Sequence, residues 1–262
     1  MIYLDDIPIS QWGLQIQKEH THPSTPELRT KTMTIPGMPG EWDFGSEFGS
    51  RPFSFPLGFI EYDIYEKQRR LNEFVAFLFD PYGLPKEKKL TFDYEMDKHY
   101  LVKVSNQIDP QRTIGFNFFI LEFKANKPYK KFKLQSDEIV WDSDIPILSD
   151  ISWLTDGSER LINSEQTIEV VNNGSIAIRY SFNMSGSGNN VNLSANGVVM
   201  NFGTFSNSTF DVDGERYTIF VNSVEDLVTP YFIDLLPGVN QIQINGSNLN
   251  LTLKEKLVYQ YL

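Results

Sequence analysis

The clearest periodic pattern in the chain is helical and lies in its first half. Four apolar residues recur at i, i+3, i+4 and i+7: Leu71, Phe74, Val75 and Leu78. Asp63 is a favourable N-cap, and Glu66 follows it at capping-box spacing. The helix should end before Asp80-Pro81, because proline disfavours helical geometry in the residue before it. The pattern therefore predicts one amphipathic helix over Ile64–Phe79.

Around this helix, apolar and polar residues alternate with the period of two that is typical of strands. Lys31–Ile35 alternates in this way. Leu90–Tyr94 and Tyr100–Val104 read as a hairpin whose strands are separated by the polar stretch Glu95–His99. Phe116–Ala125 predicts a further strand.

Beyond residue 132 the composition changes. Only 4 asparagines precede residue 133 and 15 follow it, and helical patterns disappear. Short apolar segments separated by Asn, Gly and Ser turns are typical of a β-sandwich. The predicted strands are Gln166–Val171, Ala177–Met184, Asn192–Ala195, Tyr217–Val221, Phe232–Leu236, Asn240–Asn245 and Leu249–Leu253. The sequence thus predicts two domains, residues 1–132 and 133–262.

The stretch Ile35–Phe59 has the least ordinary composition in the chain. It contains five glycines, four prolines and six Trp or Phe residues. Glycine and proline argue against a long helix or a central strand, and the aromatic content is too high for a disordered linker. We therefore expect an ordered, extended arm. Its rings could be buried either on their own domain or on a second subunit, and composition alone leaves both open.

Overall composition narrows the possible functions. With 262 residues, 40% of them hydrophobic, the chain can build a sizeable core, and it has no apolar run long enough for a transmembrane helix. The net charge is −11, and it is concentrated in residues 133–262, where 6 Lys and Arg oppose 16 Asp and Glu. Such an acidic half disfavours sequence-specific DNA binding. The absence of cysteine excludes disulfides and thiolate chemistry.

Candidate chemistry is sparse. His20 and His22 could share a metal ion, but no third ligand completes a recognisable site, so no metal and no cofactor is predicted. The sequence lacks the nucleophile-elbow, zinc-protease and phosphate-loop patterns, and no carboxylate pair stands out for glycoside hydrolysis. We therefore predict that the protein is not an enzyme and has no catalytic residues.

A carbohydrate-binding, lectin-like module that recognises the host cell surface is the alternative function. A sugar site needs an aromatic platform beside polar groups, and Trp141 and Trp153 are the candidates in the Asn-rich half. Both lie near the start of that half, where a packed tryptophan is the ordinary outcome.

Four motifs, taken in order, carry a family resemblance. They are FGSEFGSRPFSFPLGF (Phe44–Phe59), RRLNEFVAFLFDPYG (Arg69–Gly83), KLTFDYEMDKHYLVKVS (Lys89–Ser105) and IGFNFFILEFKANKPY (Ile114–Tyr129). The second half adds VNNGSIAIRYSF and YFIDLLPGVNQIQI. Together they resemble the distal tail protein family of long-tailed, non-contractile bacteriophages, over nearly the whole chain.

The resemblance implies a mainly β protein. Its N-terminal domain would be a β-sandwich-like fold with one α-helix and a projecting β-hairpin, or belt, followed by a galectin-like β-sandwich domain. Six copies would form a ring in the virion, at the distal end of the tail, after synthesis in the host bacterial cytoplasm. The ring would join the tail tube protein to the tail-associated lysin or tip protein and to baseplate or receptor-binding components. DNA would pass through its channel without specific binding, and no part would insert into a membrane.

The resemblance also favours one answer for the arm. A belt would grip the adjacent subunit, so its aromatic residues become candidates for the subunit interface. These candidates are Trp42, Phe44, Phe48, Phe53 and Phe55.

Overall fold

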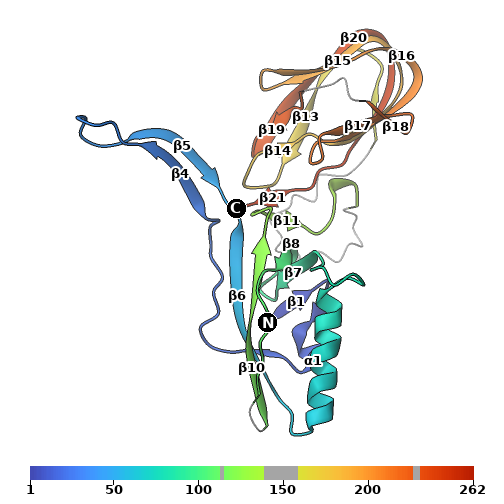
Figure 1. Ribbon diagram of the computed structural model, residues 1–262. Coiled ribbons are helices and arrows are strands. Elements are labelled where there is room, and N and C mark those ends of the chain that lie inside the picture. The colour runs from blue at the N-terminus through green and yellow to red at the C-terminus, as the bar shows by residue number, and fades with distance from the viewer. Residues whose placement is uncertain (113–114, 139–158, 227–230) are drawn as a thin grey trace. The chain divides into compact units, whose positions relative to one another are not determined.

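Buried side chains gather into two separate hydrophobic clusters, one in each half of the chain. The computed structural model describes residues 1–112, 115–138, 159–226 and 231–262 (Figure 1). It divides into unit 1, Met1–Lys130 with Leu262, and unit 2, Lys131–Tyr261. Both units are built mainly from strands, as the sequence predicts. Within the described residues, no helix has the length and hydropathy needed to span a membrane.

Unit 1 is organised around an antiparallel sheet with the strand order β2-β1-β7-β8-β10-β6-β3. The bounds are β1 Ile2–Leu4, β2 Ile7–Pro8, β3 Gln15–Ile16, β6 Arg51–Ile60, β7 Lys88–Phe92, β8 Glu95–Val104 and β10 Phe116–Ala125, with the short β9 Gln111–Arg112 beside β10. The predicted strand Phe116–Ala125 is confirmed. The predicted hairpin is also present, but its turn is Asp93-Tyr94 and Glu95–His99 belongs to β8.

Helix α1, Ile64–Leu78, confirms the helical pattern. Asp63 caps it by accepting a hydrogen bond from the backbone N–H of Tyr65 at 2.8 Å. Leu71, Phe74 and Leu78 are buried. The ring of Trp12, in the 3-10 helix Ile9–Trp12, meets that of Phe74 edge-on at 5.2 Å. The stripe of apolar residues thus faces the core of unit 1.

Strand β6 corrects one prediction from composition. The second half of the stretch Ile35–Phe59 forms a strand inside the sheet, paired with β10 over its full length and with β3 at Leu57 and Gly58. The carbonyl of Pro56 accepts a hydrogen bond from the N–H of Gln17, on the side away from β10. In an antiparallel strand the nitrogen and the carbonyl of one residue face the same side. The missing donor of Pro56 therefore falls on an edge that is only partly covered, where proline is permitted.

The first half of the same stretch forms most of the turn and the second strand of a separate two-stranded hairpin. Strands β4, Leu28–Met33, and β5, Trp42–Phe48, pair only with each other (Figure 1). Every residue of both strands is exposed. This hairpin, residues 28–48, matches the projecting element that the resemblance implies.

Unit 2 contains a sheet of strands in the order β12-β20-β15-β16-β17-β18, with β13 also paired to β20. The bounds are β11 Lys130–Phe132, β12 Arg160–Ile162, β13 Gln166–Asn172, β14 Ile178–Arg179, β15 Phe182–Ala195, β16 Val198–Asp213, β17 Thr218–Val221, β18 Val224–Asp226, β19 Asp234–Leu235, β20 Gly238–Glu255 and β21 Gln260–Tyr261. A 3-10 turn spans Ser136–Glu138, β14 pairs with β19, and β11 pairs with β21.

The long strands of unit 2 replace several short ones that the sequence predicts. Asn240–Asn245 and Leu249–Leu253 belong to one strand, β20, and β15 joins two predicted segments. The pairing shifts register next to Gly186, whose added Cβ would lie 2.0 Å from the carbonyl oxygen of Asn250. Polar and glycine residues here form bulges that curl a continuous strand. The curled sheet is consistent with the predicted β-sandwich.

Candidate subunit interface

The hairpin β4–β5 is a regular antiparallel ribbon with one irregularity. Leu28 pairs with Phe48, and Met33 with Trp42, but the register shifts after Thr30. Gly45, at φ +96°, takes up the extra residue, and its N–H bonds to the carboxylate of Asp43 at 2.8 Å. A glycine at positive φ inside a strand is the usual device for such a bulge.

One face of the hairpin carries an exposed apolar cluster, which we call the belt cluster: Met33, Trp42 and Phe44. Met33 and Trp42 are cross-strand partners, so their side chains share a face. Phe44 lies two residues from Trp42 and therefore points to that face as well. The three residues are 52%, 54% and 62% exposed. A solvent-facing group of this kind is a candidate contact site for another molecule.

The opposite face is apolar only near the base of the hairpin. Leu28 and Phe48 pair there, and the ring of Phe48 meets that of Tyr129 edge-on at 6.2 Å. Lys31 and Glu47 form an ion pair on the face of the belt cluster, since Lys31 lies two residues from Met33 and Glu47 is opposite Arg29. The hydrogen bond from Lys31 lowers the pKa of Glu47. Apolar contacts thus concentrate at the tip and the base, with charged residues between them.

The hairpin is joined to unit 1 by a closely fitted base. The N–H of Gly49 bonds to the carbonyl of Glu27 at 2.7 Å, and a Cβ at Gly49 would lie 2.8 Å from Nε of Arg29. Thr21 and Ser54 exchange backbone hydrogen bonds at 2.8 and 3.1 Å. The strand that leaves the hairpin therefore enters the core directly.

Two side chains below this junction are held inside the unit. The buried Arg51 donates from Nη1 to the hydroxyl of Tyr100 at 2.6 Å. His22 stacks on Phe92 with ring centroids 4.1 Å apart, and its Nδ1 lies 2.7 Å from the hydroxyl of Tyr94. Desolvation, together with the positive charge of Arg51, lowers the pKa of His22.

The five predicted interface residues separate into two groups. Trp42, Phe44 and Phe48 lie on the hairpin and are exposed. Phe53 and Phe55 are buried in the core of unit 1, in contact with aromatic neighbours such as Tyr100. Their burial contradicts the prediction that these two rings face another subunit. The alternation along β6, which puts odd-numbered residues on the core face, could have revealed this.

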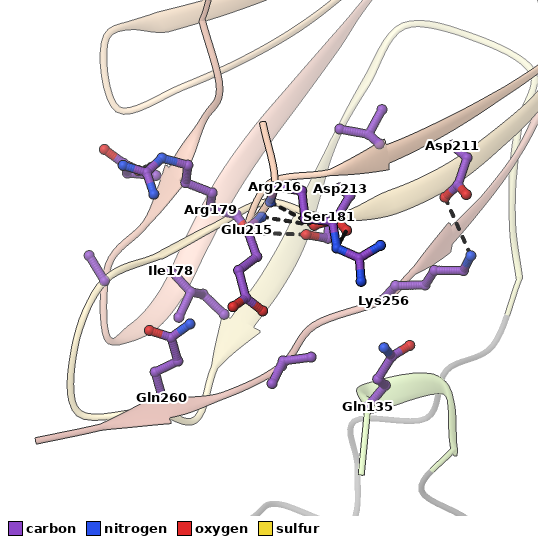
Figure 2. A pocket seen from close by; sticks show the side chains of 14 residues that line it. Gln135, Ile178, Arg179, Ser181, Asp211, Asp213, Glu215, Arg216, Lys256 and Gln260 are labelled. Carbon is purple, nitrogen blue, oxygen red and sulfur yellow. Dashed lines mark hydrogen bonds and ion pairs between the residues drawn. The ribbon is translucent and has the colours of Figure 1, made fainter. Parts of the chain in front are cut away.

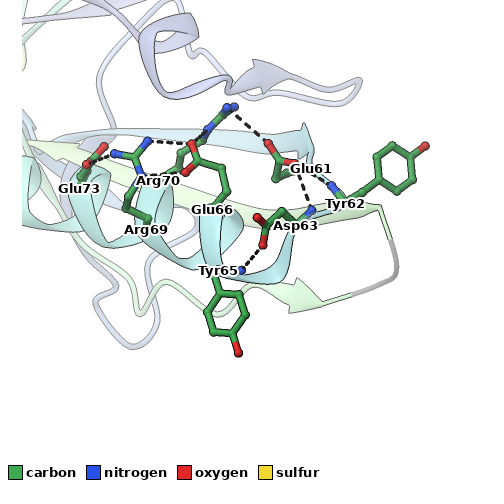
Figure 3. A network of polar contacts seen from close by, with 8 residues as sticks. All are labelled: Glu61, Tyr62, Asp63, Tyr65, Glu66, Arg69, Arg70 and Glu73. Carbon is green, nitrogen blue, oxygen red and sulfur yellow. Dashed lines mark hydrogen bonds and ion pairs between the residues drawn. The ribbon is translucent and has the colours of Figure 1, made fainter.

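Sequence reasoning missed other exposed apolar residues. Met33 completes the belt cluster, and Met38 is exposed in the turn between β4 and β5. A second exposed group surrounds the start of α1, where Tyr62, Ile64 and Tyr65 face solvent. Figure 3 shows Tyr62 and Tyr65 pointing away from the polar network of the helix.

That polar network fixes the first turns of α1. Glu66 accepts hydrogen bonds from Arg69 at 2.7 and 2.8 Å and from Arg70 at 2.9 Å. These bonds lower the pKa of Glu66 from its usual value near 4.5 to about 2. Arg70 also pairs with Glu61 at 3.4 Å (Figure 3). Arg69 and Arg70 are thus paired within the helix and its N-terminal flank.

The remaining predicted sites can be placed only in part. The sugar-platform candidates Trp141 and Trp153 lie outside the described residues. In the part of the chain that the structure describes, no group of three or more His, Cys, Asp or Glu side chains is arranged to hold a metal ion.

Comparison with known proteins agrees with this architecture. Residues 7–125 match the family described as phage tail protein RIFT-related domain. No match was found among curated protein sequences. The crystal structure of the phage SPP1 Dit protein, described as a paradigm of the hub adsorption apparatus in phages that infect Gram-positive bacteria, has a TM-score of 0.70 at 13% identity. The match covers 100% of this chain and 98% of the SPP1 chain.

Two phage p2 baseplate structures in the activated conformation are more distant. The form with Ca has a TM-score of 0.37 at 11% identity, over 93% of this chain and 90% of the other. The form with Sr has a TM-score of 0.41 at 12% identity, over 94% and 90%. The family match supports the phage tail part of the resemblance over residues 7–125, and the match to SPP1 Dit shows a shared fold over the whole chain.

Proposed function

We propose that this chain, which carries a phage tail domain and has the fold of a distal tail protein, forms a ring of six copies at the distal end of a phage tail. The hairpin β4–β5 carries this proposal. A two-stranded hairpin is marginally stable on its own, and this one exposes all its strand residues in the single chain. Packing against a neighbouring copy would supply the missing contacts.

The belt cluster, rather than the hairpin as a whole, has the composition of an interface core. Trp, Phe and Met are enriched at such cores, whereas charged residues are depleted. The belt cluster of Met33, Trp42 and Phe44 fits that composition, and burying aromatic rings removes large areas from water. Phe48 would extend the contact at the base.

The ring would act as a structural adaptor. We propose that it joins the tail tube protein to the tail-associated lysin or tip protein and to baseplate or receptor-binding components, and that the chain does not catalyse a reaction. The chain would be made in the host cytoplasm and then built into the virion. The acidic charge of residues 133–262 disfavours tight binding of DNA by that half of the chain. We propose that DNA passes through the channel without specific binding.

Light scattering on the purified chain tests the role of the belt cluster. The wild-type protein should elute with six chain masses, whereas Trp42→Ser combined with Phe44→Ser should give one chain mass. The matched control is Leu161→Ser combined with Val224→Ser, which removes two exposed apolar residues of unit 2 and should leave the ring intact. A double hairpin variant that retains the wild-type mass would contradict the proposal.

A further inference from the structure

Unit 2 contains a polar cavity that the ring proposal does not use. Its volume is about 460 Å³, and it lies where the turn after β16 meets β14 and the segment between β20 and β21 (Figure 2). This volume is within the range of small-ligand sites, about 300–1,000 Å³.

The cavity is lined by apolar side chains and by charged side chains, and we call the charged ones the rim. Ile178, Val212 and Val258 contribute the apolar surface. The lining also includes three cationic and four carboxylate side chains: Arg179, Arg216, Lys256, Asp211, Asp213, Glu215 and Asp234. Because the opposite charges nearly balance, neither a strongly anionic nor a strongly cationic ligand is favoured.

The ion pairs across the rim are long. Lys256 lies 3.4 Å from Asp211, Arg216 lies 3.7 Å from Asp213, and the distance from Arg179 to Asp234 is 3.9 Å. Charge-assisted hydrogen bonds are normally about 2.7–2.9 Å long. The cations and carboxylates can therefore still donate to and accept from a bound molecule.

The side chain of Arg179 is held in place from below. Its guanidinium lies 4.1 Å from the centre of the Tyr217 ring, which in turn meets the Phe232 ring edge-on at 5.6 Å. Tyr217 adopts φ +58°, an uncommon conformation for a bulky residue that is often associated with functional sites. The arginine thus presents a fixed, planar set of donors.

The turn that carries Tyr217 is fitted against β14 as well. A Cβ at Gly214 would lie 2.5 Å from Cβ of Arg179, so this close approach requires glycine. The carboxylate of Asp213 accepts from the N–H groups of Glu215 and Arg216 at 3.0 and 3.1 Å. The rim is therefore organised before any ligand arrives, which reduces the cost of binding.

We propose that this cavity binds a neutral, hydroxyl-rich ligand of the size of a mono- or disaccharide. A hydroxyl group donates one hydrogen bond and can accept two, so it can bond to a carboxylate and to a cation at the same time. Arg179 with Asp234, and Lys256 with Asp211, provide two such pairs in the lining. Figure 2 shows Arg179 and Lys256 at different sides of the cavity. The apolar part of the lining would contact the C–H surface of a sugar ring.

Saturation-transfer NMR on the full-length protein tests this inference. The probes are D-glucose, D-galactose, N-acetyl-D-glucosamine, maltose and lactose. At least one should give a saturable signal with a Kd on the order of 1 mM, as expected for a small ligand held by a few hydrogen bonds. If none of the probes gives a saturable signal, the proposal is overturned.

Two lysines that lie two residues apart, Lys254 and Lys256, provide a matched pair of variants for the binding test. Lys256 pairs with Asp211 at 3.4 Å in the cavity, whereas Lys254 pairs with Asp137 at 3.3 Å and does not line it. Lys256→Gln and Arg179→Met should each weaken binding about tenfold, and Lys254→Gln should not change it. Equal affinity in Lys254→Gln and Lys256→Gln would contradict the assignment. Because this site is separate from the hairpin, light scattering of the same variants should still show six chain masses.

Discussion

The hairpin β4–β5 and strand β6 are neighbours in the sequence with similar aromatic content, but they occupy opposite environments. Trp42, Phe44 and Phe48 are exposed on the hairpin, whereas Phe53 and Phe55 are buried in the core of unit 1. The difference arises from pairing. Strand β6 lies between β10 and β3, while the hairpin strands have only each other.

This contrast shows what aromatic composition can and cannot decide. Burying a large ring is favourable, but the composition does not say whether the covering surface belongs to the same chain. Here the chain supplies a core for β6 and leaves the belt cluster of Met33, Trp42 and Phe44 exposed. We attribute the missing surface to a neighbouring copy.

Alanine substitutions on the two sides of the contrast should differ most in stability. Phe55→Ala creates a cavity in the core and should lower the free energy of unfolding by about 3–5 kcal/mol. Phe44→Ala removes a ring that is exposed in the single chain. In the Trp42→Ser background, which we expect to be monomeric as well, its effect should stay within about 0.5 kcal/mol. Urea denaturation followed by circular dichroism measures both. Similar losses in the two variants would show that Phe44 is packed within its own chain.

A smaller effect is expected from His22, in the segment that leads into the hairpin. Its pKa is lowered in the folded protein by desolvation and by the cations Arg51, Lys130 and His20, against the opposing effect of Glu95. The unfolded chain therefore binds a proton more readily, so the stability that neutral His22 provides is present above pH 6.5 and decreases as the pH falls below it.

Thermal melts at pH 7.5 and 5.5 measure this contribution. His22→Gln should lose less stability between these pH values than the wild-type protein. An identical pH dependence in His22→Gln and wild type would contradict the role assigned to His22.

The local pattern of the sequence predicted much of the fold. The stripe that includes Leu71, Phe74 and Leu78 located α1 to within one residue, because the helix is amphipathic and capped by Asp63. Phe116–Ala125 was predicted as a strand and is one, because it alternates regularly over ten residues. Such elements are specified by residues close together in the chain.

Features that depend on distant partners could not be predicted in the same way. The prolines of β6 argued against a strand within the sheet, but only the register with β10 and Gln17 shows that the missing donor falls on a partly covered edge. Asn and Gly residues within β20 resembled a turn, although they form a bulge. The cavity around Arg179 joins segments far apart in the sequence and had no local signal.

The most direct test of the account is the mass of a chain whose hairpin has been shortened. Arg29 and Glu47 face each other across the strands, so replacing Thr30–Ser46 with an Asn-Gly turn removes the belt cluster and leaves β6 intact. We predict that light scattering will show a single chain with an unchanged unfolding midpoint in urea relative to the monomeric Trp42→Ser, Phe44→Ser variant. A shortened chain that still assembles into a ring of six would contradict the central claim.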